Sequence, residues 1–302
     1  MDNITKSFKD MLLERLHAEF KGYDFRVEKI VKNNDFTYDG VCIRSENGEI
    51  FPVIPLARLE KRYKEGKSME AIVESFREAI NSELKMDFYY VMEFENVKES
   101  IMLKVVNFDM NSGFLETVPH RRYLDLAVAY TVEMPDKENE NKAYSVMVSD
   151  KLMKVWGVTE EELYRIAEKN YFEKMPTVIR DIRAVILELM GVEVDEKDLP
   201  ADGNEENMYM MSNRKNLNGA AAILDTEVIN NFAKKIGRNL YILPSSTHEL
   251  IIVPEYDNLN KKELLSLVKY NNKSVVCRME WLSHNIYYYD MNSNNIEIVM
   301  QS

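Results

Sequence analysis

The chain has 302 residues, 45% of them hydrophobic and 30% charged, which suits a globular protein with one large core or two smaller ones. Lys and Arg number 39 against 51 Asp and Glu, and the formal net charge of -12 opposes binding to nucleic acids and to anionic membrane surfaces. With only Cys42 and Cys277 available, a disulfide framework and a four-cysteine zinc site are excluded.

The N-terminal region predicts a helix and then a β-hairpin. Over residues 4–20 apolar side chains recur every four positions between charged ones, which is typical of an amphipathic helix and of neither a signal peptide nor a membrane span. We therefore expect a cytoplasmic protein. In the hairpin, residues 40–44 pair with residues 49–54, and the chain turns at Asn47 and Gly48 because this residue pair tolerates positive φ.

Two helices are expected after the hairpin. Pro55 suits the first turn of a helix that Gly66 ends, and Ser68 caps the helix that follows. The tripeptide GKS at residues 66–68 also resembles the end of a phosphate-binding P-loop, but Lys61 stands where that motif requires a glycine. The interpretation as helix ends is therefore favoured, and we expect no cofactor.

The middle of the chain predicts two strands and two helices. Apolar side chains alternate over residues 124–134, which indicates a half-buried strand, and residues 144–148 predict a second strand antiparallel to it. Thr159 and Glu162 form the capping box of a helix, because each side chain satisfies a free backbone amide. A further helix is expected over residues 177–190.

An acidic, proline-containing stretch at residues 191–207 is the best candidate for a domain linker. A boundary there divides the chain into an N-terminal α+β domain, residues 1–190, and a C-terminal α+β domain, residues 208–302. The C-terminal elements expected are strands at 208–211, 220–224, 240–243 and 250–253, a helix from Asp225 to Gly237, a helix from Lys261 and a final hairpin. The predicted fold class is α+β, with two domains whose mainly antiparallel sheets are flanked by helices.

The stretch LYILPSSTHELIIVP, residues 240–254, is the first candidate for chemistry. In a hydrolase, Ser245 or Ser246 would be the nucleophile and His248 its base, and Glu249 would be the orienting carboxylate. Residues two apart on an extended chain stand roughly 6 to 7 Å apart, which separates the serine from the histidine. The stretch also lacks the glycines of a nucleophile elbow. A turn explains the proline and the serines, and it is the favoured interpretation.

A basic cluster, His120, Arg121 and Arg122, precedes the strand predicted at 124–134 and is the second candidate. Such a cluster can bind a phosphate or carboxylate, with arginine in a bidentate contact and histidine as a donor whose charge can be tuned. It can equally be a solvated strand entry with Asp125 as its counter-ion, and this interpretation is favoured.

The other histidines, His17 and His284, are expected at the surface. None of the four histidines is spaced from another histidine, a cysteine or a carboxylate as in a known zinc motif, so no metal site is expected, although residues distant in the sequence could still assemble one. Methionine is abundant at 18 residues, and core filling explains most of it, although methionine-rich surfaces also suit partner binding.

Three segments carry a resemblance to a known family: VPHRRYLDLAVAY, VWGVTEEELYRIAEKN and NGAAAILDTEVINNFAKKIGRNLYILPSSTHELIIVP. They are similar to domain of unknown function 5688, a family of low-GC Gram-positive bacteria, and the resemblance extends from Phe25 to Asp290. It implies no activity, cofactor or catalytic residue. By this resemblance, PSSTHE at residues 244–249 matches a family signature, although the family tends to carry a hydrophobic residue where Thr247 stands.

These observations predict a non-enzymatic accessory or protein-interaction module of the bacterial cytoplasm, because no catalytic motif is complete. The alternative is a hydrolase or anion-processing enzyme that uses Ser246 and His248 with a distant third residue. A protein partner is expected, whereas nucleic acid and membrane partners are not.

Overall fold

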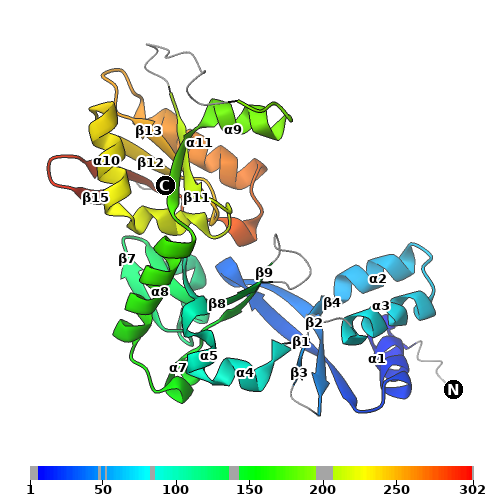
Figure 1. Cartoon of the computed structure of the whole chain (residues 1–302). Helices are drawn as coiled ribbons and strands as arrows, with labels where there is room; N and C mark the ends of the chain where they lie inside the picture. Colours follow the sequence, from blue (N-terminus) through cyan, green and yellow to red (C-terminus); the bar gives the residue numbers. More distant parts are fainter. Residues whose placement is uncertain are drawn as a thin grey trace. The chain divides into compact units, whose positions relative to one another are not determined.

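The structure, a computed structural model, describes residues 6–46, 49–51, 53–81, 86–135, 143–194 and 207–300 (Figure 1). Helices alternate with antiparallel strand pairs along the chain, so the predicted α+β class with antiparallel sheets flanked by helices is confirmed. By the contacts between residues, the chain divides into two units. Unit 1 consists of Met1–Lys32, Phe36–Lys98 and Pro135–Tyr144, and unit 2 of Asn33–Asp35, Glu99–Met134 and Ser145–Ser302.

Unit 1 contains a sheet built on a long hairpin. β1 (Tyr23–Lys32) and β2 (Phe36–Ser45) pair over their whole length. The shorter strands of this sheet are β3 (Glu49–Ile50), β4 (Ile54–Pro55) and β5 (Met86–Asp87). Because β3 and β4 both pair with β2, the hairpin predicted between residues 40–44 and 49–54 is confirmed. Its predicted turn at Asn47 and Gly48 lies outside the described residues.

The helices described in unit 1 are α1 (Phe8–Glu19), α2 (Leu56–Lys64), α3 (Met69–Asn81), α4 (Phe88–Met92) and α5 (Phe94–Val97). Leu16 of α1 and Phe76 of α3 are fully buried beside Phe25 of β1, which gives this unit its core. Ser68 accepts a hydrogen bond from the first turn of α3, and Gly66 follows α2 with a φ of 92°. Both predicted helix ends are therefore confirmed.

A second sheet contains β6 (Ile101–Asn107), β7 (His120–Tyr123), β8 (Leu126–Pro135) and β9 (Ala143–Met147). β8 pairs with each of the other three strands, so the expected partnership between the strands near 124–134 and 144–148 is confirmed. The first of these strands begins later than predicted, at Leu126, because Leu124 has a φ of 58° and lies in the turn between β7 and β8.

The expectation that this strand is half-buried is wrong, because β8 is buried on both faces from Leu126 to Glu133. Its large apolar residues occupy one face as the alternation predicts. The opposite face carries Ala127 and Ala129, and Ala127 packs against a small cluster that includes Val106. Alanine is small and only weakly hydrophobic, so it does not indicate burial in the sequence as a large apolar residue does, although it allows close packing on that face.

α6 (Ser112–Leu115) lies between β6 and β7 in the sequence, and α7 (Asp150–Trp156) and α8 (Glu160–Lys174) follow β9. The capping box at the start of α8 is confirmed: the Thr159 amide donates to Glu162 Oε2 at 2.8 Å, and the Glu162 amide donates to Thr159 Oγ1 at 3.3 Å. This cap fixes the first turn of α8, which carries the acidic residues discussed below.

The third sheet follows the order β10-β11-β13-β12-β14-β15. Its strands are β10 (Thr177–Asp181), β11 (Tyr209–Asn213), β12 (Leu240–Pro244), β13 (Leu250–Pro254), β14 (Ile286–Asp290) and β15 (Asn295–Met300). The helices beside it are α9 (Ile182–Leu189), α10 (Thr226–Ile236) and α11 (Lys261–Ser274) (Figure 1). The predicted strands 208–211, 240–243 and 250–253, the helices from Asp225 and Lys261, and the final hairpin are confirmed.

Two elements differ from the expectation. Residues 177–190 form β10 followed by α9, because β-branched residues at the start pair with β11 and Asp181 caps the helix through the Arg183 amide. Residues 220–224 lie in a 3-10 helix, η5 (Gly219–Leu224), rather than in a strand. The run of alanines there has no β-branched residue except Ile223, so its apolar character gave no reliable indication of a strand.

The boundary predicted at residues 191–207 does not coincide with the division by contacts. β10 precedes this stretch and β11 follows it, yet the two strands pair with each other inside unit 2. An acidic composition indicates exposure to solvent, and a solvated stretch can connect two paired strands as readily as two domains. Most of the stretch, residues 195–206, lies outside the described residues.

Candidate functional site

The loop at residues 245–249 joins β12 to β13, and hydrogen bonds of its own side chains close it. We call it the serine loop. The hydroxyls of Ser245 and Ser246 donate to Glu249 Oε1 at 3.0 and 2.8 Å. Ser246 Oγ in turn accepts a hydrogen bond from the His248 amide at 2.9 Å. These are bonds of a serine-containing turn, in which the hydroxyls replace backbone partners.

The imidazole of His248 is bonded to another element rather than to a serine. Its Nδ1 accepts the Asn218 amide at 3.2 Å, which places the ring proton on Nε2, and Nε2 lies 3.8 Å from Glu280 Oε1. A general base needs a free ring nitrogen within hydrogen-bond reach of the hydroxyl that it deprotonates. The structure shows no such contact between the Ser246 hydroxyl and the His248 ring. The hydroxyl donates to Glu249, and the ring accepts the Asn218 amide instead.

The backbone of the loop is tied to four surrounding elements, including 3-10 helix η6 (Arg278–Glu280). The bonds run from Ser212 Oγ to the His248 carbonyl at 2.7 Å, from the Ala220 amide to the Thr247 carbonyl at 3.2 Å, from the Thr247 amide to the Glu280 carbonyl at 2.8 Å, and from Asn271 Nδ2 to the Ser245 carbonyl at 2.7 Å. Because β11, η5, η6 and α11 all contribute, the loop joins distant parts of unit 2.

Behind the loop, Asn218 connects His248 to a buried carboxylate. Asn218 Nδ2 donates to Glu133 Oε1 at 3.3 Å, and its carbonyl accepts the Tyr171 hydroxyl at 3.1 Å. Glu133 is only 7% exposed, and burial raises the pKa of its carboxyl above the ordinary value, although the Asn218 bond and two nearby lysines act in the opposite direction. A buried carboxyl with a raised pKa favours its protonated form in the folded chain.

We expect Glu133→Gln to raise the unfolding free energy of unit 2 at about pH 8, on the order of 1 kcal/mol. Because the folded-state pKa of Glu133 is raised, the fold favours the protonated acid, and the contribution of this group to stability is lost as the pH rises through the folded pKa. Glutamine keeps the acceptor for Asn218 and carries no charge. Urea unfolding at about pH 4 and pH 8 measures the effect, which should be small at the lower pH.

The control is Glu116→Gln, which removes one carboxylate from an exposed position of the same unit. This variant should leave the pH dependence of unfolding unchanged. Equal effects of the two substitutions would show that burial of Glu133 is not the cause.

An irregular segment, residues 278–283, has every one of its carbonyls hydrogen-bonded. The donors to Arg278, Met279, Glu280, Trp281, Leu282 and Ser283 are, in order, Asn34 Nδ2, Asn33 Nδ2, the Thr247 amide, Asn34 Nδ2, Asn107 Nδ2 and Asn272 Nδ2. The distances range from 2.7 to 3.1 Å. Four asparagine side chains therefore hold most of a segment that has little regular structure of its own. We call it the asparagine-held segment.

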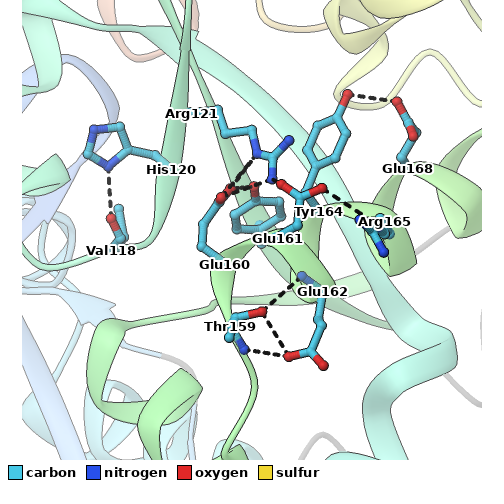
Figure 2. Close-up of polar contacts among 11 residues, drawn as sticks. Val118, His120, Arg121, Thr159, Glu160, Glu161, Glu162, Tyr164, Arg165 and Glu168 are labelled. Atoms are coloured by element: carbon cyan, nitrogen blue, oxygen red, sulfur yellow. Dashed lines mark hydrogen bonds and ion pairs between the residues drawn. The ribbon is translucent and has the colours of Figure 1, made fainter.

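The basic cluster at 120–122 is divided between the two faces of β7. Figure 2 shows His120 and Arg121 directed to opposite sides of the strand. Arg121 donates to the Glu160 carboxylate from Nε at 2.8 Å and from Nη2 at 3.0 Å, and it also donates to Glu161. His120 Nδ1 lies 2.9 Å from the Val118 carbonyl oxygen, and the Arg122 guanidinium lies 4.4 Å from the centre of the Phe108 ring.

Arg121 is the centre of a link between β7, β8 and the start of α8. The Tyr130 hydroxyl donates to the same Glu160 carboxylate, and the guanidinium lies 3.9 Å above the Tyr164 ring. The hydrogen bond to Glu160 is the main cause that raises the pKa of Arg121, while burial raises the pKa of Tyr130. An external phosphate would have to displace two carboxylates from Arg121, so this arrangement serves to join strand and helix.

Asp125, expected as the counter-ion of the cluster, is bonded elsewhere. Its carboxylate accepts hydrogen bonds from Ser283 Oγ at 2.6 Å, from Asn285 Nδ2 at 2.8 Å and from the Tyr287 hydroxyl at 2.7 Å. The three donors lie just beyond or at the end of the asparagine-held segment. The carboxylate of Asp125 therefore supports that segment, and Glu160 and Glu161 neutralise Arg121 in its place.

Sequence reasoning missed the asparagine-held segment and most of its partners. One local property of asparagine bears on Asn34. Asparagine tolerates positive φ better than most other non-glycine residues, and Asn34 has a φ of 59° and Asn218, beside the serine loop, a φ of 51°. Trp281 of the segment and His284, which directly follows it, are half-exposed, and their ring centres lie 5.3 Å apart. His284 is half-buried, in partial agreement with its expected surface position.

Across the described ranges, no group of three or more His, Cys, Asp or Glu side chains could hold a metal ion. Among the helices of those same ranges, none combines the length and apolar character needed to cross a membrane.

A model of the family of unknown function DUF5688 matches residues 2–291, which is nearly the whole chain. No curated protein and no solved structure matches the chain significantly. The match includes the serine-containing loop, the basic strand β7 and the asparagine-held segment. The chain therefore belongs to the family of unknown function DUF5688.

Proposed function

We propose that this protein is a non-enzymatic accessory protein that works by binding another protein, in the cytoplasm of a low-GC Gram-positive bacterium. The asparagine-held segment carries this proposal. Its six consecutive carbonyls are bonded from four other parts of unit 2, and it leaves Trp281 and His284 half-exposed. A surface that is already ordered loses little conformational entropy on binding, which favours recognition of a partner.

The residue types at this surface support binding in the same way. Tryptophan is enriched among the residues that contribute most to protein interfaces. The Trp281 ring is fixed by the hydrogen bond from its Nε1 to the Val276 carbonyl at 3.1 Å and by its edge-on contact with His284. A large side chain held in one position offers contact area at a small entropic cost.

The bonds of the serine loop favour binding over hydrolysis. Ser246 donates to Glu249 while His248 Nδ1 accepts the Asn218 amide, so both groups contribute to the shape of the loop. Hydrolysis by the Ser246 and His248 pair would require breaking both bonds before the hydroxyl could reach the imidazole. The loop then supports the asparagine-held segment through the Thr247 amide.

We expect Ser246→Ala to leave partner binding unchanged. The substitution should lower the unfolding free energy by about 1 kcal/mol, because it removes the hydroxyl that bonds Glu249 and the His248 amide. Affinity capture with the tagged full chain in native lysate, followed by reconstitution with the purified partner, measures binding. Hydrolysis of p-nitrophenyl acetate by the purified chain measures activity. The proposal fails if the chain hydrolyses the ester in a Ser246-dependent and His248-dependent manner and no partner is enriched.

A further inference from the structure

The exposed side of α11 carries a basic stripe that is unusual in so acidic a chain. Lys262, Lys269 and Lys273 are exposed and are spaced by seven and four residues, which places them on one stripe of the helix. In the part of the chain that the structure describes, none of the three forms an ion pair with a carboxylate. These ammonium groups are therefore available to a negatively charged ligand.

A large aromatic side chain lies beside the stripe on the same exposed side. Tyr270, three positions before Lys273, is 64% exposed, whereas Leu264 and Val268 on the other side of the helix are buried in the core of the third sheet. An exposed aromatic residue beside a row of charges is typical of protein interfaces.

A hollow adjoins this stripe and is lined by Lys269, Asn272, Lys273, Trp281 and His284. Asn272 is 2% exposed, and its Nδ2 donates to the Ser283 carbonyl and to His284 Nδ1, both at 2.9 Å. The Asn272 Oδ1 is buried without a hydrogen-bond partner among the described residues. The hollow therefore combines two cations with an aromatic wall.

The bond from Asn272 also fixes the chemistry of His284. Because Nδ1 accepts, the ring proton is on Nε2, and the imidazole presents a neutral donor. Burial lowers the pKa of His284 and the Lys269 charge adds to the lowering, while the Asp125 carboxylate acts in the opposite direction. The hollow thus offers positive charge from the two lysines and an uncharged flat surface from Trp281 and His284.

We propose that the stripe of Lys262, Lys269 and Lys273, together with the hollow at Trp281 and His284, binds an acidic segment of a partner protein. We call these residues the α11 face. Carboxylates of the segment bond the lysines, and an aromatic or aliphatic side chain between them rests on Trp281. This inference rests on the proposed function, because it names the surface and the chemistry of its partner.

The length of the stripe matches a short peptide. From Lys262 to Lys273 the helix rises roughly 16 Å, the reach of about five residues of an extended chain. The hollow is open to solvent, which suits a side chain of a bound peptide better than an enclosed small molecule. Acidic residues on either side of one apolar residue therefore meet the lysines and the hollow together.

Charge favours an acidic peptide over a nucleic acid. Nucleic-acid affinity depends on many phosphate contacts, roughly 6 to 10 in a typical protein. The α11 stripe offers three lysines for such contacts. The net charge of -12 repels a long polyanion along its whole length. A short segment instead meets the α11 face at contact distance, where charges farther away than about 8 Å are screened at physiological salt.

The test uses the full chain and a fluorescein-labelled peptide of repeating Glu-Trp pairs, with a peptide of repeating Gln-Trp pairs as reference. Fluorescence anisotropy should show tighter binding of the Glu-Trp peptide, weakening as salt rises from about 50 to about 300 mM. The double variant Lys269→Glu with Lys273→Glu should bind it at least about tenfold more weakly. The double variant Lys269→Arg with Lys273→Arg should retain binding.

The matched control is Lys234→Glu with Lys235→Glu, which makes the same charge change at exposed positions of α10 and should alter affinity less than about twofold. Equal losses in the two charge-reversed variants, or no loss in either, overturn the proposal. Tighter binding of labelled oligodeoxythymidine than of the Glu-Trp peptide overturns it in favour of a nucleic acid. A dimer in sedimentation that Lys269→Glu with Lys273→Glu dissociates overturns it in favour of a second copy.

Failure of this inference can be distinguished from failure of the proposed function. If a partner captured from native lysate binds the Lys269→Glu, Lys273→Glu variant as tightly as the original chain, the α11 face is not the interface, while the protein remains an interaction module. If no partner is captured and the chain catalyses a Ser246-dependent reaction, the proposed function fails.

Discussion

Replacing Asn34 by alanine is expected to lower the unfolding free energy of unit 2 by about 4 kcal/mol. Asn34 is fully buried and its Nδ2 donates to the carbonyls of Arg278 and Trp281, at 2.7 and 2.8 Å. Its Oδ1 accepts Asn111 Nδ2 at 3.0 Å, and its own amide donates to Asn111 Oδ1 at 2.7 Å. Alanine leaves buried polar groups unsatisfied, and such groups cost more than the bond itself contributed.

The backbone adds a second cost. Asn34 has φ 59° and ψ 38°, a left-handed conformation that costs alanine roughly 1 kcal/mol. Urea unfolding followed by tryptophan fluorescence measures the effect in unit 2, because both tryptophans of the chain, Trp156 and Trp281, lie in that unit.

The matched control is Asn216→Ala. Asn216 has a φ of 50° but its side chain is exposed. Alanine there adds only the cost of the left-handed backbone conformation and should lower the unfolding free energy by about 1 kcal/mol. If the two variants were equally unstable, the bonds of Asn34 to the asparagine-held segment would contribute nothing. In that case the argument that this segment is a preordered surface would lose its main support.

Local features of the fold could be predicted because their partners are close in the sequence. The capping box of Thr159 and Glu162 spans three residues, and the helix that Asp225 caps ends at Gly237 with a φ of 73°. The serine loop is of the same kind, since Ser246 bonds groups at most three residues away. In each case one short window contains the donor and its acceptor.

Features that depend on distant partners could not be predicted. The helix expected over 177–190 begins as a strand because β10 pairs with β11, which lies beyond the acidic stretch. Asn34 reaches Arg278 across 244 positions, and no periodicity in the sequence relates the two. The basic residues of β7 were identified as charged, but the sequence could not show that Arg121 bonds Glu160 of α8. Tertiary contacts decided each of these outcomes.

The same dependence on distant partners determines the chemistry of the serine loop. The sequence shows Ser246 and His248 as neighbours, and their chemistry depends on what each bonds. The Asn218 amide, thirty positions from His248, occupies the imidazole nitrogen that a hydrolase would need. The asparagines that hold residues 278–283 have no motif, because an amide side chain that bonds a distant carbonyl looks like any surface asparagine in the sequence.

Replacing Gly219 by alanine is expected to destabilise unit 2 by about 3 kcal/mol and to loosen the serine loop. A Cβ at this position would overlap Ser212 Oγ and the His248 carbonyl oxygen, and would lie 3.0 Å from the Asn213 amide nitrogen. Ser212 Oγ already donates to that His248 carbonyl, so neither group can move without breaking the bond. The effect is steric, because Gly219 is not in a left-handed conformation.

Two measurements test this prediction. Urea unfolding gives the change in stability, and nitrogen NMR of the histidine rings reports whether His248 Nδ1 still accepts the Asn218 amide, which we expect the variant to lose. The control, Gly113→Ala, places its Cβ 4.0 Å from the nearest side-chain atom of Asp35, an ordinary contact, and should change stability by less than about 0.5 kcal/mol.

The steric cause can be separated from a general loss of packing by a second substitution. Ser212→Ala in the Gly219→Ala background removes the hydroxyl that the new methyl group meets, and it should restore part of the lost stability, roughly 1 kcal/mol, although Ser212→Ala alone is destabilising. Strictly additive effects would contradict the predicted clash. β11, η5 and the serine loop meet at Gly219. The comparison of the two single variants with the double variant therefore measures how strongly the elements that support the loop are coupled.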